Sequence, residues 1–240
     1  MASIQQWYTK WPGVSLATVA AMLLWLEPGD RPIAHARTRT GAVSGTVRVS
    51  GETSSSSIVA YLQATGPRSD IHTKSPRGSG ATRASIRQRD RQFVPQLTVV
   101  PVGSEIEFPN DDRIFHNVFS LSRARRFDLG LYRSGSSRTV TFDRPGVVEV
   151  YCNIHPEMVA HVLVLDTAHY AIVGKGGKFR LQEVPAGNYD LVVWQAYGDP
   201  VRTPVVVNPG KTTHTDVPVR GSARPRRHNR KDGTPYGRYR

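Results

Sequence analysis

Short apolar stretches that alternate with polar positions recur along most of the chain. This period of two residues is typical of β-strands with one buried face. Several such strands, separated by turn residues at intervals of about 8–12 residues, favour an antiparallel sandwich or barrel. The sequence therefore predicts an all-β fold, in which residues 121–130 are the one stretch suited to a short helix or lid. The predicted strands cover residues 42–49, 58–63, 96–100, 105–108, 117–120, 138–142 and 147–151.

The alternation continues in residues 176–194, between Gly and Pro turns. The pattern G-x-F-x-L-x-x-V-P-x-G-x-Y-x-L resembles the carboxypeptidase regulatory-like, transthyretin-type β-sandwich, and it predicts a regulatory-like β unit over residues 169–219. About fifty residues are short for an independent core. We therefore expect this unit to pack on the preceding domain, or to complete its sandwich with the strands of residues 42–63.

Two polar segments break the strand pattern. Residues 66–92 are rich in Arg, Ser and Gly, and we interpret them as a flexible basic loop. Residues 220–240 hold eight basic residues against Asp232, a net charge of +7 within the chain's +13, and lack apolar periodicity. This composition predicts a disordered basic tail. Such a tail either attracts an acidic protein, anionic lipid or polyanion, or is merely solvated.

The amino terminus has the features of a secretory signal over residues 1–36. Lys10 precedes an apolar run of 13 residues, 14–26, which is too short to span a bilayer comfortably, and Ala34-His35-Ala36 fits a cleavage site. An uncleaved amphipathic anchor is the alternative. Export predicts a periplasmic or otherwise exported protein, without a transmembrane span in the mature chain and without a nucleic-acid partner.

The candidate chemistry lies in two short motifs. Cys152, the single cysteine, begins the sequence C-x₂-H-x₂-M with His155 and Met158, and His116-Asn117 lies 36 positions upstream. Thiolate and thioether are soft ligands that suit Cu(I), and a His₂Cys set with a weak axial Met is typical of blue-copper sites. Each residue alone has a simpler interpretation, since a lone Cys is usually a small buried hydrophobe. Structural zinc is a rival metal, but it prefers several cysteines.

These motifs resemble the cupredoxin family, in which C-x₂-H-x₂-M is the short ligand loop of amicyanin-like members. The stretch from Phe93 to Met158 is similar to periplasmic cupredoxins of the methylamine-utilisation type. The resemblance implies a Greek-key β-sandwich over residues 37–168. It also implies His116 and His155 as imidazole ligands, Cys152 as the thiolate and Met158 as the axial ligand. Asn117 would tie the two ligand loops together and help to screen the thiolate.

The resemblance further implies an electron carrier, not an enzyme, with one copper ion cycling between Cu(I) and Cu(II). Electrons would leave through His155, amid an apolar patch of Ile154, Pro156 and Phe115. The partner would be a redox protein such as a c-type cytochrome or a dehydrogenase, with an acidic surface.

Two other functions stay open. One is a copper-binding or interaction module that delivers metal without electron transfer. The weaker one is a copper-enzyme subunit, which would need a second metal site. The remaining histidines are scattered, and His161 is expected on a strand face rather than at a metal.

Overall fold

A computed structural model describes residues 39–51, 58–65, 81–221 and 228–236. These residues fold into β-strands with one short 3₁₀ turn, Lys175–Gly177, so the predicted all-β fold is confirmed. The expected secretory signal lies outside the described residues. Within the part that the structure describes, no helix is long and apolar enough to cross a membrane.

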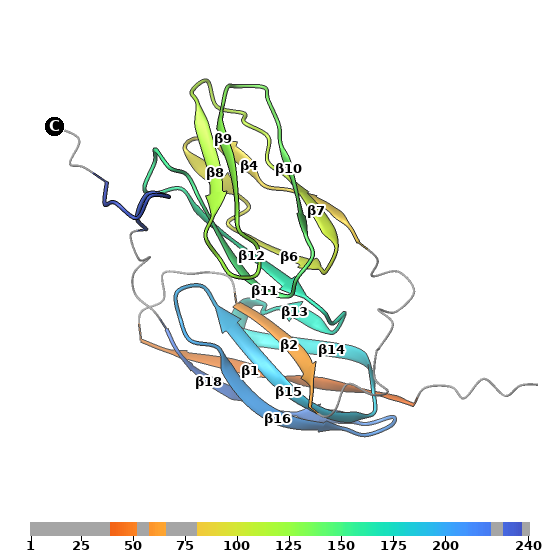
Figure 1. The fold of residues 1–240 in the computed structure, drawn as a ribbon. Coiled ribbons are helices and arrows are strands. Elements are labelled where there is room, and N and C mark those ends of the chain that lie inside the picture. Colours follow the sequence, from red (N-terminus) through yellow and green to blue (C-terminus); the bar gives the residue numbers. More distant parts are fainter. Residues whose placement is uncertain (1–38, 52–57, 66–80, 222–227, 237–240) are drawn as a thin grey trace, which may run out of the picture. The chain divides into compact units, whose positions relative to one another are not determined.

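The strands from β3 to β12 make up a central sandwich of two sheets and one added hairpin (Figure 1). One sheet has the order β10-β7-β3 and the other β6-β12-β11-β8-β9, and both line one apolar cluster; β4 and β5 form a separate hairpin. The strands are β3 (Arg83–Ser85), β4 (Arg87–Arg89), β5 (Gln92–Val94), β6 (Leu97–Pro101), β7 (Ser104–Glu107), β8 (His116–Ser120), β9 (Phe127–Tyr132), β10 (Thr139–Phe142), β11 (Gly146–Tyr151) and β12 (Val159–Leu165).

The remaining strands form a second unit, the flanking sandwich. Its sheets have the orders β14-β1-β17, with β18 also on β1, and β13-β2-β15-β16, and both face a second apolar cluster. The strands are β1 (Thr40–Ser50), β2 (Ile58–Ala64), β13 (Tyr170–Ile172), β14 (Lys178–Pro185), β15 (Gly187–Gln195), β16 (Val201–Val207), β17 (Thr212–His214) and β18 (Val217–Arg220).

Burial follows the sequence pattern in both sandwiches. In β11, Val148 and Val150 are buried while Glu149 between them is exposed, as expected for a strand with one solvated face. In contrast, every residue of β12 is buried. This strand lies between β11 and β6, and a run that is apolar except for His161 suits a strand at the centre of a sheet.

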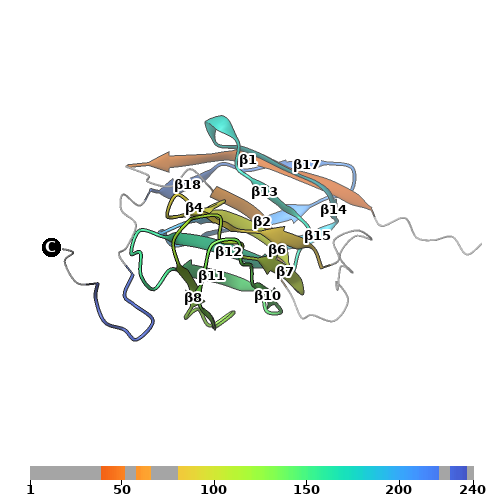
Figure 2. The same ribbon diagram turned by 90° about the horizontal axis from the view of Figure 1, so that it is seen from above.

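The pairing of the first two strands differs from the predicted domain boundaries. β1 pairs with β14 and β2 with β15, so these two early strands join the same sheets as strands β13 to β18. Figures 1 and 2 show the early, orange strands β1 and β2 among the late strands of the flanking sandwich. The central sandwich is therefore inserted between β2 and β13. Of the two arrangements left open by the sequence, the structure has the one in which residues 42–63 complete the C-terminal unit.

The prediction of a loop over residues 66–92 is wrong where it can be compared. Residues 66–80 lie outside the described residues, but β3, β4 and the start of β5 occupy the rest. Ile86 and Gln88 are buried, whereas Ser85, Arg87 and Arg89 beside them are exposed, so the segment alternates as a strand does. A strand pattern is not recognisable from the sequence here because Gln88, a polar residue, lies at one of the buried positions. Residues 121–130 form no helix, and the last four of them already belong to β9.

The predicted disorder of the basic tail is also wrong for residues 228–236. His228 is buried, and Tyr236 and Lys231 make hydrogen bonds to the segment that follows β11. Ring stacking and side-chain hydrogen bonds hold this part of the tail, which composition alone does not indicate. Residues 222–227 and 237–240 lie outside the described residues.

Candidate metal centre

The pairing of β8 and β11 brings the two predicted motifs to the same end of one sheet. His116 is the first residue of β8, and Cys152 directly follows the last residue of β11. These strands are antiparallel, with Tyr151 opposite Phe119, so the start of β8 lies beside the end of β11. His155 lies in the turn from β11 to β12. Residues 36 positions apart in sequence thus become neighbours.

The donor atoms of three predicted ligands converge. Nδ1 of His116 lies 3.0 Å from Nδ1 of His155, and Sγ of Cys152 lies 3.9 and 3.6 Å from these two nitrogens, respectively. A point equidistant from all three atoms lies about 2 Å from each, close to the metal–nitrogen distance of ~2.0–2.1 Å and slightly below the metal–thiolate distance of ~2.3 Å known for zinc. The arrangement therefore fits one metal ion. It is the one such group of His, Cys and acidic residues among the described residues.

The thiol is shielded from solvent and surrounded by amides. Burial raises the pKa of the Cys152 thiol, and hydrogen bonds from the backbone amides of Asn117, Ile154 and His155 oppose this rise without cancelling it. These amides favour the thiolate, which is the form that binds metal. Burial also lowers the pKa of His155, helped by the neighbouring His116. A neutral imidazole is the metal-binding form, so the lowered pKa of His155 favours ligation. The amide hydrogen bonds to Cys152 favour ligation as well, because they stabilise the thiolate.

The loop from Cys152 to Met158 is closed by its own backbone. The amide of Cys152 donates to the carbonyl of Met158 at 3.3 Å, and the amide of Met158 donates to the carbonyl of His155 at 3.1 Å. The Met158 side chain is fully buried in the cluster that also contains Cys152. Its backbone is thus held beside the three donor atoms, and its role as a fourth ligand stays a prediction.

Asp112 is a functional candidate that the sequence did not single out. Its Oδ2 lies 2.7 Å from Nε2 of the fully buried His116, the ring nitrogen opposite the one that faces Cys152. A carboxylate at this position fixes the tautomer of a ligating histidine and raises its basicity. An aspartate four positions before the histidine was the available signal, but Asp111 is adjacent and the sequence gives no reason to choose between them.

Asp112 is in turn held by the β4–β5 hairpin. The amides of Asp90 and Arg91 donate to its two carboxylate oxygens at 2.6 and 2.9 Å. Both hairpin residues have φ of 54°, as a two-residue turn with both positions left-handed requires. Partial burial favours the neutral form of Asp112, but these amides and His116 together lower its pKa below the usual value. The carboxylate is therefore charged when it contacts His116.

Asn117 contacts both sides of the site, although differently from the prediction. Its backbone amide donates to the Cys152 sulfur, while its side-chain Nδ2 donates to Oδ1 of Asp128 at 2.8 Å. The side chain of Asn117 therefore points to β9. Its connection to the ligand loop runs through Asp128 and then through Lys231 of the tail. The contact of Asn117 with the sulfur is made by its main chain.

The residues of the predicted exit patch differ in exposure. His155, Ile154 and Pro156 are half-buried, whereas Phe115 is 57% exposed. The chain also exposes Ile114 and Leu131, two large apolar residues that the sequence analysis did not include. Leu131 belongs to β9, where it pairs with Asn117, directly next to His116. An apolar surface beside the ligands is thus available.

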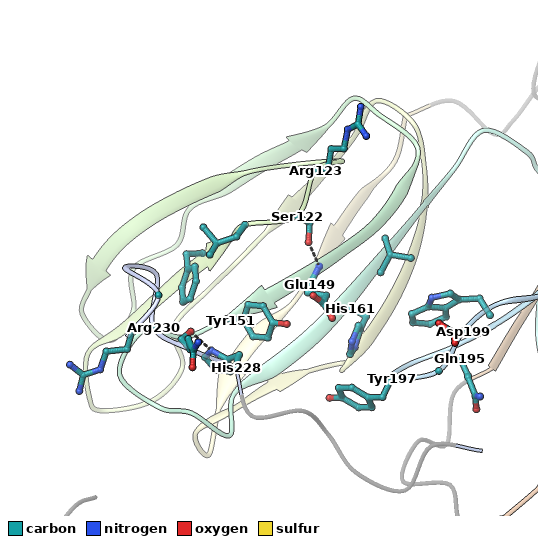
Figure 3. A pocket seen from close by; sticks show the side chains of 17 residues that line it. Ser122, Arg123, Glu149, Tyr151, His161, Gln195, Tyr197, Asp199, His228 and Arg230 are labelled. Carbon is teal, nitrogen blue, oxygen red and sulfur yellow. Dashed lines mark hydrogen bonds between the residues drawn. The ribbon is translucent and has the colours of Figure 1, made fainter. Parts of the chain in front are cut away.

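His161 lies away from these ligands, as predicted. Its ring is buried on β12, and its centroid lies 5.7 Å from that of Trp194 and 5.1 Å from that of Tyr197. It lines a cleft of about 760 Å³ together with Tyr151 and His228, and Figure 3 shows these side chains. Burial lowers the pKa of His161 and keeps the ring neutral. Its ring packs against two aromatic side chains. Of the other histidines, His35 and His72 lie outside the described residues.

No family model and no curated protein sequence matches the chain. Solved structures that resemble it include the purple cupredoxin from Nitrosopumilus maritimus, with 26% identity, 34% of this chain and 99% of that chain covered, and a TM-score of 0.32. Amicyanin from Paracoccus versutus has 15% identity over 44% of this chain and 98% of its own, with a TM-score of 0.31.

A third similar structure is a copper-containing nitrite reductase from Thermus scotoductus, with 23% identity and a TM-score of 0.33. The similarity covers 35% of this chain and 22% of the reductase, so the chain spans about a fifth of that protein. The geometry of the donor atoms, rather than these similarities, is the basis for the function proposed below.

Proposed function

We propose that the protein is an exported blue-copper electron carrier of the cupredoxin type. The observation that supports this most directly is the convergence of Sγ of Cys152 with Nδ1 of His116 and His155 around a point about 2 Å from each. Two imidazoles, one thiolate and a thioether nearby in sequence form the donor set of blue-copper sites. The four proposed ligands are His116, Cys152, His155 and Met158.

Bound copper would supply one-electron chemistry by alternating between Cu(I) and Cu(II). The residues supply the rest. The three amides around Sγ hold the thiolate, and Asp112 holds the ring of His116. A site held by so many neighbours rearranges little, and small rearrangement favours fast electron transfer. His155 is half-buried, in contrast to the fully buried His116, and is the proposed route to a partner protein.

The partner is proposed to be another redox protein with an acidic surface. The chain has a net charge of +13, so an acidic partner would be attracted over distances set by the ionic strength. Apolar side chains beside the site, Phe115 with Ile114 and Leu131, suit a transient contact at which water is excluded. Export is proposed from residues 1–36.

A different function, copper delivery without electron transfer, shares the same donor atoms. The flanking sandwich and the basic tail are the features that favour it, because an electron carrier needs neither. A delivery site would prefer one oxidation state and release the metal readily. Zinc is the other metal that fits the distances, and it would give no visible colour.

One spectroscopic experiment separates these functions. The mature protein loaded with Cu(II) is expected to show an intense visible thiolate-to-copper band that disappears on reduction and returns on oxidation. Cys152→Ala is expected to abolish the band, because the thiolate is its source. Ser85→Ala, at an exposed position in β3, is the control and leaves the band intact. A colourless wild-type protein, or a band that survives Cys152→Ala, contradicts the proposal.

A further inference from the structure

The part of the tail that the structure describes lies against the proposed ligand loop. The hydroxyl of Tyr236 donates to the carbonyl of Cys152 at 2.6 Å. The backbone amide of Lys231 donates to Oδ1 of Asn153 at 2.9 Å. Two neighbouring residues of the loop are therefore held by a segment about eighty positions later in the chain. This contact is specific, since both loop acceptors have a defined partner in the tail.

Lys231 also connects this loop with the strand that carries His116. Its Nζ lies 2.6 Å from Oδ2 of Asp128, and Oδ1 of the same carboxylate accepts from Nδ2 of Asn117. A continuous series of contacts thus runs from Asn117 through Asp128 and Lys231 to Asn153. The link between the two ligand segments, expected from Asn117 alone, passes through the tail.

A buried aromatic contact anchors the start of this segment. The ring of His228 stacks on Tyr151, the residue before Cys152, with centroids 4.2 Å apart and an interplanar angle of 27°. Figure 3 shows these two side chains next to each other. Tyr236 packs edge-on against His228, at 5.2 Å. The segment therefore contacts the end of β11 as well as the loop that follows it.

We propose that residues 228–236 form a strap that positions the thiolate of Cys152 for the metal. This inference deepens the proposed function and rests on it for its copper readouts. Tyr236 and Lys231 are positioning residues, because they touch the loop backbone and Asn153, not the donor atoms. By holding the Cys152 carbonyl and the Asn153 side chain, they fix the start of the loop, whose next two amides, from Ile154 and His155, hydrogen-bond to Sγ.

The contacts of the strap are of a kind that affects the loop more than the global fold. The Lys231 and Asp128 side chains are 45% and 39% exposed, and a pair exposed to this extent contributes little to stability. The hydroxyl of Tyr236 adds one neutral hydrogen bond. Loss of either contact is therefore expected to loosen residues 152–158 while both sandwiches stay folded.

The first test needs no metal. Hydrogen exchange of the backbone amides of Cys152, Ile154 and Met158 is measured in the metal-free full chain, for the wild type, Tyr236→Phe and Lys231→Met. The variants are expected to exchange about two- to tenfold faster at these amides, the factor that corresponds to one lost hydrogen bond. Tyr170→Phe and Lys211→Met, both in the flanking part of the chain, are matched controls that exchange as the wild type does. Unchanged protection in both strap variants overturns the proposal.

The second test uses the copper-loaded protein. The double variant Tyr236→Phe/Lys231→Met is expected to bind copper but to shift the visible band and the reduction potential, whereas the matched double control keeps both. A strap that merely stabilises the fold would lower the melting temperature and leave the band and potential unchanged, which overturns the positioning role. If the wild type shows no copper band, the proposed function fails, while the exchange experiment still decides whether the strap holds the loop.

Discussion

The two sandwiches differ in where they bury polar side chains. The core of the flanking sandwich is built from residues such as Val43, Leu62 and Leu191, and its buried polar residues are few among those described. The central sandwich has a comparable apolar core, but one end of it buries a group of polar side chains around the proposed metal. This group comprises Gln88, Asn110, His116 and Asn117.

Several buried polar groups of the central sandwich are hydrogen-bonded to backbone carbonyls, although Oε1 of Gln88 and Oδ1 of Asn117 have no partner. Nδ2 of Asn110 donates to the carbonyls of Ile114 and Tyr132, and the hydroxyl of Tyr132 donates to the carbonyl of Phe108. Burial of such groups is costly unless they are hydrogen-bonded. Here the hydrogen bonds shape the approach to His116. Under the proposed function, the chemistry lies in the central sandwich, whereas the flanking sandwich has an apolar core with few buried polar residues among those described.

The largest effect on stability is expected from a core substitution in the flanking sandwich. Leu191→Ala, at a fully buried position of β15, is expected to destabilise the protein by about 2–5 kcal/mol through lost burial and a cavity. Val206→Ala, which is 53% exposed on β16, is the control and should cost far less. Chemical denaturation measures both. The copper spectrum of the folded fraction should stay unchanged in both variants; a shifted band in Leu191→Ala would show that the two sandwiches are not separable in this way.

The second prediction concerns the carboxylate behind His116. Asp112→Asn removes the negative charge beside Nε2, and it turns an amide group towards the donors Asp90 and Arg91. Replacement of such outer residues typically weakens metal binding about 10- to 100-fold. Asp111→Asn is a close control, because Asp111 is ion-paired with Arg87 instead. Metal titration measures the affinities, and equal values for the two variants would contradict the role of Asp112.

The proposed ligands could be predicted because their signal is local. Cys152, His155 and Met158 occupy one short loop whose spacing is informative, and the adjoining β11 alternates clearly. His116 is identified from its place directly before a predicted strand and from the adjacent Asn117. The structure brings three of these four side chains together through the pairing of β8 and β11. The fourth, Met158, remains a prediction.

The residues that hold the proposed ligands in place could not be predicted, because they are polar and their partners are distant in sequence. Asp112 depends on a hairpin at Asp90 and Arg91, in a segment whose arginines suggested a loop. The strap depends on Tyr236 and Lys231, in a tail whose composition is typical of disorder. Composition describes the average behaviour of a segment, whereas two or three specific contacts can order it.

The third prediction tests the axial position. Met158→Leu keeps a buried apolar side chain of similar volume, so folding should be little affected. Because the axial thioether is a weak ligand that tunes the potential, copper should still bind. Loss of a donor that favours Cu(II) should raise the reduction potential by roughly 59 mV, equal to a tenfold change in the relative affinity for the two oxidation states. Potentiometry measures the shift, and loss of copper binding would show that Met158 is a primary ligand.

The smallest effect is expected from the basic charges outside the strap. The part of the tail that the structure does not describe contains Arg224, Arg226 and Arg227. Replacing these three residues by Ser leaves Tyr236 and Lys231 themselves unchanged. Charges of this kind steer a partner and are screened within about 10 Å at 0.1 M salt. Electron exchange with an acidic redox partner should therefore slow by less than about tenfold at low ionic strength, and the difference should shrink as salt is added.

The band and the potential of this triple variant should match those of the wild type, which distinguishes it from the strap variants. Stopped-flow measurements over a range of salt concentrations test the prediction. If the triple variant and the wild type exchange electrons equally fast at low salt, these arginines are simply solvated, and the tail acts on the central sandwich only through residues 228–236. A rate difference that persists at high salt would instead indicate a direct contact with the partner, because screening removes only the long-range part of the attraction.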